Sequence, residues 1–192
     1  MKLKDKKEVE TMTYDAHDVA LWILAEAKRQ GIVMTHMKLQ KLLYYAQAYY
    51  IAMTGEPLFK NSIMAWQHGP VIPDVYHSFS KFGNSIIRDV KDVTPPDGLD
   101  NFIKSIIRDK GHLSAHELRT ITHNEDTWRN AWFNSASRCI TNKMISEYFS
   151  QSFWTSDEED DFQPSFNSQE EEDKFLRDNL TKEDINAILA TR

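Results

Sequence analysis

The feature that most constrains this chain is a long amphipathic helix predicted over residues 39–53. Apolar residues recur there at steps of three and four, as in a helix with one buried face: Leu39, Leu42, Leu43, Ala46, Tyr49, Tyr50 and Met53. Thr35 can cap its start, and Gly55 can end it with a positive φ. We expect this helix to be central, with Tyr44 and Tyr45 flanking its buried face and partly exposed.

A small β element follows the central helix in the sequence. Residues 62–67 suit a short strand, His68-Gly69-Pro70 suits a tight turn, and residues 86–93 suit a second strand that could pair with the first. Further helices are predicted over about 15–30, 73–82, 99–110, 115–122, 125–133 and 140–149. The predicted fold class is therefore mainly α, a compact helical domain with β structure near 62–67 and 86–93.

Two short helices near residues 115–133 carry a recognisable start signal. Ser114 with Glu117, and Thr122 with Glu125, have the spacing of a capping box. Each pair predicts the first turn of a helix.

The charge of the chain is concentrated near its C-terminal end. The formal net charge is −6 over 192 residues, and residues 151–173 contain many acidic side chains and no basic ones. This composition predicts four regions: a flexible N-terminus at 1–12, a folded domain at 13–150, a disordered acidic linker at 151–173 and a short helix at 174–192.

Composition also limits the predicted cellular compartment and binding partners of the protein. No apolar run approaches the ~20 residues that a membrane helix needs, and the charged N-terminus does not resemble a secretory signal. A single cysteine, Cys139, fits a reducing cytoplasm. The negative net charge argues against a nucleic-acid-binding protein.

The residues that could carry catalysis or bind a metal do not form a convincing set. His112 and His116 stand four apart, with His123 and Asp126 beyond them, but His112 precedes the Ser114 cap, so one continuous helix does not carry the pair. Ordinary helix-end histidines are the favoured interpretation, and His68 and Cys139 are read as structural. No catalytic, cofactor-binding or metal-binding residue is assigned. An enzyme stays open as an alternative that substitution of the histidines with a metal assay would test.

Three separated segments resemble one known family. KLQKLLYYAQ, WQHGPVIPDVY and LSAHELRTITHNEDTWRNA are similar to the Panacea domain of SocA-type antitoxins and phage-associated proteins, over roughly residues 13–150. The resemblance assigns these motif positions a mainly structural role: Lys38, Leu39, Gln40, Leu42, Leu43, Tyr44, Tyr45, Trp66, His68, Gly69, Pro70, Tyr76, Leu113, Ser114, Thr122, His123 and Trp128.

The resemblance implies that the protein is a cytoplasmic antitoxin, with a co-encoded toxin as its partner and direct protein–protein binding as its mechanism. It also admits a protease adaptor that delivers the toxin to a protease or its unfoldase. A DNA-binding regulator of its own operon is a third possibility, but the helix after Glu125 offers only Arg129 as a basic residue.

The acidic segment suggests a second contact with the partner. Aromatic residues are interleaved there among the carboxylates, which is unusual for a segment that only confers solubility. We therefore hypothesise that the domain docks on the toxin while this segment lies across the toxin's active face, through these residues: Phe153, Trp154, Asp157, Glu158, Glu159, Asp160, Asp161, Phe162 and Phe166.

Overall fold

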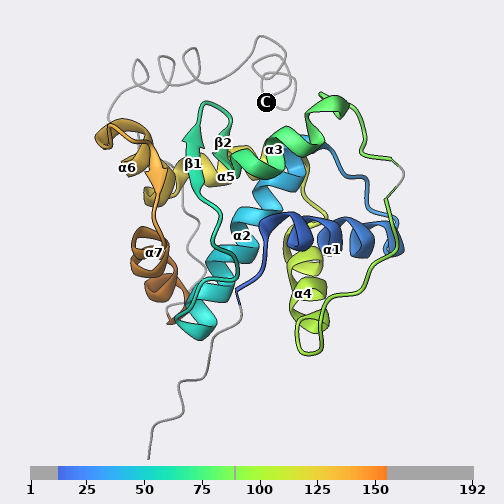
Figure 1. The fold of residues 1–192 in the computed structure, drawn as a ribbon. Helices are drawn as coiled ribbons and strands as arrows, with labels where there is room; N and C mark the ends of the chain where they lie inside the picture. The colour runs from blue at the N-terminus through green and yellow to red at the C-terminus, as the bar shows by residue number, and fades with distance from the viewer. Residues whose placement is uncertain (1–12, 89, 155–192) are drawn as a thin grey trace, which may run out of the picture.

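The computed structural model describes residues 13–88 and 90–154, with side chains described up to residue 150. These residues form a mainly helical domain with a small antiparallel sheet (Figure 1), as the sequence predicts. The helices are α1 (Ala16–Arg29), α2 (His36–Thr54), α3 (Pro73–Phe79), the 3-10 turn η1 (Ser80–Phe82), α4 (Asp100–Lys110), α5 (Ala115–Asn124), α6 (Asp126–Asn134) and α7 (Asn142–Trp154). The strands are β1 (Ile63–Trp66), β2 (Gly69–Val71) and β3 (Cys139–Ile140).

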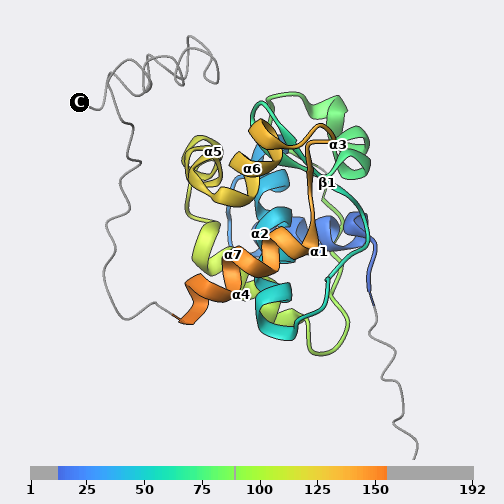
Figure 2. The same ribbon diagram turned by 90° about the vertical axis from the view of Figure 1, so that its left-hand side faces the viewer.

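The helix α2 is the centre of the domain, which confirms its predicted role. It contacts α1, α3, α4, α5, α7 and β2, and Figure 2 shows α7 lying against it. Its bounds follow the sequence signals: Thr35 accepts a hydrogen bond from Lys38 N, and Gly55 ends the helix at φ 77°. Because neighbours surround α2, most of its length has no solvent-facing side.

The four tyrosines of α2 are buried in the opposite order from the one predicted. Tyr44 and Tyr45 are 0% and 1% exposed, whereas Tyr49 and Tyr50 are only half-buried, and Met53 is 63% exposed. The apolar spacing predicts a single buried face, but an enclosed helix has no second face to expose. The last turns of α2 extend past its neighbours, so side chains there reach solvent.

The sheet begins with a β-hairpin. β1 and β2 pair with Trp66 opposite Gly69, which leaves Gln67 and His68 as a two-residue loop. The observed turn thus begins one position before the predicted one, and Gly69 and Pro70 belong to β2. In the order β2-β1-β3, β2 is an edge strand, where a proline without an N–H group is tolerated.

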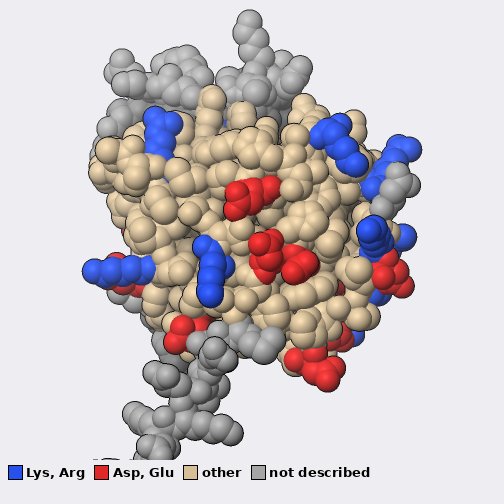
Figure 3. Space-filling model, viewed as in Figure 1, with Lys and Arg blue, Asp and Glu red and all other residues tan. Residues whose placement is uncertain are grey.

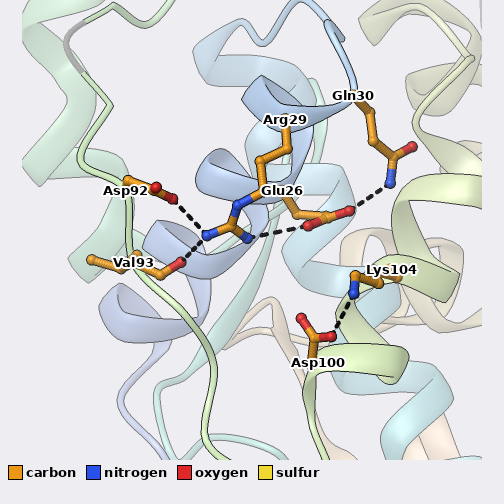
Figure 4. Close-up of polar contacts among 7 residues, drawn as sticks. All are labelled: Glu26, Arg29, Gln30, Asp92, Val93, Asp100 and Lys104. Carbon is orange, nitrogen blue, oxygen red and sulfur yellow. Dashed lines mark hydrogen bonds and ion pairs between the residues drawn. The ribbon is translucent and has the colours of Figure 1, made fainter.

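The second predicted strand, over residues 86–93, is wrong. The strand that completes the sheet beside β1 is β3, more than forty residues further on. Ile86 makes only an isolated bridge with Thr35. Side chains of α1 bind the carbonyls that a strand would use. Lys28 Nζ donates to Val90 O, and Arg29 Nη2 donates to Val93 O at 2.8 Å (Figure 4). Cationic side chains at the end of α1 therefore fix this segment as irregular chain.

One of the two predicted capping boxes is present. Ser114 accepts from Glu117 N and Glu117 accepts from Ser114 N, at 3.1 and 2.6 Å, and α5 begins there. The box from Thr122 to Glu125 is wrong, because Thr122 lies inside α5 and donates to Arg119 O. Glu125 is the N-cap of α6, and its side chain points inward to two tyrosines.

The C-terminal end of the described domain is helical. α7 continues to Trp154, so the linker boundary predicted at residue 151 falls within a helix. Ile145 and Phe149 of α7 are buried in the common core with residues of α1, α2, α4 and α6. Within the described ranges, no helix is long and apolar enough to cross a membrane.

Candidate functional site

Three distant segments meet beneath the β-hairpin, around the side chain of Lys41. Lys41 is fully buried, and its Nζ donates to Pro70 O at 2.9 Å. The chain passes so close that a Cβ on Gly69 would lie 2.7 Å from Lys41 Nζ and 2.9 Å from Thr122 Oγ1. Gly69 has φ 95°, which L side chains rarely adopt. α2, β2 and α5 are therefore joined at a point that requires glycine.

Basic groups surround this point. Arg119 and His123 of α5 are buried within the same region. Burial lowers the pKa of Lys41 well below its usual value, and the charge of Arg119 lowers it further. Burial also lowers the pKa of His123 to about 2, with Arg119, Lys41 and His68 acting in the same direction. His123 is therefore neutral, and it stacks on Trp128 with ring centroids 3.9 Å apart.

A buried carboxyl group lies on the other side of α2. Tyr44 and Tyr45 donate to the two oxygens of Glu125, at 2.5 and 2.7 Å, and Tyr44 also bonds Thr127. Burial raises the pKa of Glu125 to about 7, although both tyrosine hydrogen bonds and the charge of Lys110 lower it. Because both oxygens have partners, Glu125 fastens the start of α6 to α2 and is not free for chemistry.

Other polar side chains of α2 bind backbone groups of the surrounding segments. Gln47 accepts from Phe59 N and donates to Phe59 O, both at 3.0 Å. Gln40 accepts from Ile72 N at 2.8 Å, and Lys38 Nζ donates to Gly111 O at 2.7 Å. A buried backbone group without a partner is costly, so these bonds fix the loops that surround the helix.

The tryptophans of the motif segments differ in burial. Trp128 is fully buried and donates from Nε1 to Trp66 O at 3.0 Å. Trp66 is only half-buried. Its ring packs edge-on against Tyr76, 4.9 Å between centroids. Trp66 thus connects the core to the surface.

A cavity of about 330 Å³ opens at this surface between α2, the hairpin and the end of α3. It lies beside the Lys41 junction and contains several of the predicted motif residues. Its lining consists of His36, Met37, Gln40, Lys41, Trp66, Gln67, His68, Val71, Tyr76, Ser80, Gly83 and Asn84.

The histidines considered for metal binding lie in different environments. His112 and Asp126 are exposed, His116 is half-buried, and His123 is enclosed against Trp128. Across residues 13–88 and 90–150, no three or more His, Cys, Asp or Glu side chains are grouped so as to hold a metal. Cys139 is a half-buried free thiol in β3.

The structure places the predicted residues in two groups. The motif positions from Lys38 to Trp128 lie in α2, the hairpin, α3, α5 and α6 or directly beside them. Among them, Gly69, Pro70 and Thr122 lie at Lys41. Tyr44 and Tyr45 bond Glu125. Of the residues predicted to bind a partner, Phe153 and Trp154 are the last two residues of α7, and the structure describes only their backbone. The other seven, between Asp157 and Phe166, lie outside the described residues.

Comparison with known proteins agrees with the motif segments. Residues 39–129 match the family model described as Antitoxin SocA-like, Panacea domain. Over these residues the chain is similar to the SocA-like Panacea family, as its motifs predict. Over 122 residues it is 33% identical to Antitoxin SocA from Caulobacter vibrioides (strain NA1000 / CB15N), a match that covers 57% of this chain and 65% of that protein. No solved structure matches the chain.

Sequence reasoning missed the buried charges at the centre of the site. Lys41, Arg119 and Glu125 are 0–5% exposed, although such residues are rarely buried without partners. For Lys41 a signal existed, since it lies directly between Gln40 and Leu42 in a helix that is predicted to be central. Arg119 and Glu125 carry no comparable signal, because each sits in a short polar helix or at its cap.

Proposed function

We propose that this protein is the antitoxin of a toxin–antitoxin pair and neutralises a co-encoded toxin by direct protein–protein binding. The observation that carries the proposal is the Panacea domain match over residues 39–129, together with the relative named Antitoxin SocA. The expected setting is the cytoplasm, where such a toxin would act.

The architecture supports a binding module with a rigid body. The polar motif side chains Lys38, Gln40 and Tyr44 are all engaged within the fold. These bonds maintain the shape of the domain, so most of the contact area with a toxin falls to surface residues. Figure 3 shows the charged side chains of one face scattered singly or in small groups, without a large basic or acidic patch.

The acidic C-terminal segment supplies the second part of the proposal. It begins at the end of α7, which packs against α2, so it leaves directly from the folded body. Many carboxylates without a cation attract a basic surface, and the interleaved aromatic residues can fill apolar pockets. We infer that residues 151–173 contact the toxin while the domain provides the larger docking surface.

The neighbouring open reading frame gives the decisive test. A small adjacent gene that is toxic alone and tolerated together with this gene is the expected result, and the two proteins should co-purify as a stable complex. Protection without a detectable complex at any concentration would contradict direct neutralisation.

The same co-expression experiment distinguishes direct neutralisation from the protease-adaptor alternative. If the toxin disappears during protection and reappears when the host protease is inactivated, delivery to a protease is the mechanism. If the toxin persists at full level in a complex, binding alone neutralises it.

A further inference from the structure

The cavity beside Lys41 has an unusual balance of chemical groups. Among the described residues that line it, none is acidic, whereas Lys41, His36 and His68 carry basic nitrogens and Gln40, Gln67 and Asn84 carry amides. A pocket of this size suits a small group or a side chain. Its lining offers hydrogen-bond donors in excess and no carboxylate.

Two buried nitrogens of this wall lack hydrogen-bond partners among the described residues. Gln40 uses its oxygen for Ile72 N, and its Nε2 is buried with no hydrogen-bond partner among the described residues. His36 Nε2 is in the same situation. Lys41 has three N–H donors, and across the described residues Pro70 O is the acceptor found for them. A buried donor without an acceptor is energetically costly, so an entering oxygen would be favoured here.

The surrounding charges favour a negatively charged oxygen over a neutral one. Arg119 lowers the pKa of Lys41 electrostatically, and Arg119, Lys41 and His68 lower the pKa of His123 in the same way. All of these neighbouring groups are basic. In a partly dehydrated site this positive potential is weakly screened. An anion would also favour the protonated form of His36, which burial now disfavours, and His36 could then donate.

The aromatic walls give the cavity a fixed shape. Tyr76 packs between Trp66 and His36, with ring centroids 4.9 and 4.5 Å away. These rings present apolar faces next to the donors. A carboxylate carried on one or two methylene groups matches both features, because the methylenes contact the rings while the oxygens reach the basic wall.

We propose that this cavity is a binding site for the carboxylate of an acidic protein side chain, bound against the wall of His36, Gln40 and Lys41. Two sources offer this group: an Asp or Glu of the toxin, which rests on the proposed function, or the acidic segment of this chain. The binding chemistry is the same in both cases, and the test separates them.

The first experiment uses the full-length protein and a small probe. Nuclear magnetic resonance is recorded during titration with N-acetylglutamate α-amide, and separately with N-acetylglutamine α-amide as the uncharged match. We expect the indole signal of Trp66 and the side-chain amide signal of Gln40 to shift with the glutamate probe alone. An equal response to both probes would overturn a carboxylate site, as would the lack of a response to either probe when the acidic side chains of residues 157–161 are also replaced by amides.

A pair of exposed histidines supplies the matched variants. His68→Glu places a negative charge at the cavity, and His112→Glu places one at an exposed position outside the lining. We expect His68→Glu to weaken glutamate-probe binding at least tenfold and His112→Glu to leave it unchanged. Equal effects of the two variants would overturn the assignment to this cavity.

The source of the carboxylate is read from two further measurements. In one, the acidic side chains of residues 157–161 are replaced together by their amides in the full-length protein. If Trp66 and Gln40 signals then move, the chain's own segment occupies the cavity. If these signals do not move, and toxin binding is weakened by His68→Glu but not by His112→Glu, the toxin supplies the carboxylate.

Failure of the two proposals is distinguishable. A cavity that binds the glutamate probe in a protein without any toxin partner would refute the antitoxin function and keep the site. The site would be refuted, and the function kept, by two results together. The toxin complex would be unaffected by His68→Glu, and the Trp66 and Gln40 signals would not change when the acidic segment is neutralised.

Discussion

Gly69 begins β2 at a position where both backbone conformation and space exclude a side chain. We predict that Gly69→Ala destabilises the protein by roughly 2–5 kcal/mol, since a positive φ costs about 1–3 kcal/mol and overpacking a further 1–3 kcal/mol. The collision is with Lys41 and Thr122, so the effect is on folding and not on one activity. Chemical denaturation followed by circular dichroism measures it.

The chain provides a matched control in Gly98. Its φ is 88°, close to the 95° of Gly69, but a Cβ there would meet nothing within 4 Å. Gly98→Ala should therefore show the cost of backbone strain alone. If the two substitutions destabilise equally, the close approach to Lys41 contributes nothing and the prediction is wrong.

Two buried titratable groups act in opposite directions on stability. The folded pKa of Glu125 is raised to about 7, so its contribution is full below the unfolded value near 4.5 and is lost as pH rises through 7. The folded pKa of His123 is lowered to about 2, so its contribution is present above 6.5 and is lost as pH falls. Between about pH 4.5 and 6.5 the two effects oppose each other.

Comparison of Glu125→Gln with the wild type isolates the carboxyl group. From pH 4.5 to above 7 we expect the wild type to lose up to about 3 kcal/mol relative to the variant, because only the wild type must ionise a buried carboxyl. Unfolding free energies of both proteins over this pH range give the difference directly. A difference that does not change with pH would show that Glu125 is not perturbed by burial.

At the scale of the element, the start of α5 depends on its capping box. Ser114→Ala removes the side-chain acceptor of Glu117 N and should cost about 1 kcal/mol. Glu117→Gln keeps an oxygen for Ser114 N and should cost less than half of that. Thermal unfolding compares the two. If Glu117→Gln is as harmful as Ser114→Ala, charge at the helix start matters more than the reciprocal hydrogen bonds.

The helices could be predicted from the sequence because their signals are local. Thr35, Gly55 and Ser114 act within a few residues of where they stand, and α2 and α5 begin or end there. Local signals also mislead when a distant partner competes. The Thr122–Glu125 spacing suggests a cap, but the two tyrosines of α2 bind the Glu125 carboxyl group instead.

The sheet and the buried site could not be predicted in this way. β3 has two residues and pairs with β1 across a long sequence separation, so its pattern is too short to detect. The 86–93 segment has strand-like residues, but Arg29 and Lys28 bind its carbonyls. The burial of Lys41 depends on Pro70, 29 residues away. Each of these outcomes depends on long-range contacts.

At the scale of the whole molecule, the acidic segment should act with the folded domain. Deleting residues 155–192 keeps the whole of α7, so the body should remain folded while toxin affinity falls and becomes less dependent on salt. Phe162→Ala together with Phe166→Ala should speed release of the toxin more than it slows association. Surface plasmon resonance at two salt concentrations separates the rates.

A variant that exchanges the acidic side chains of 155–173 for amides serves as the control for length. It should lose the salt dependence but keep the aromatic contacts. If the truncated protein binds and protects as well as the full chain at moderate salt, the segment only confers solubility.

The enclosure of α2 also has a consequence during protein synthesis. Tyr44 and Gln47 find their partners Glu125 and Asn142 81 and 95 residues later in the chain. Ribosomes add about 5–20 residues per second, so α2 waits roughly 5–20 s for these partners to be made. Until α7 emerges, the nascent chain exposes the apolar surface of its own central helix. Chaperones and proteases therefore have a defined interval in which to act on each new copy, before the finished fold closes around that helix.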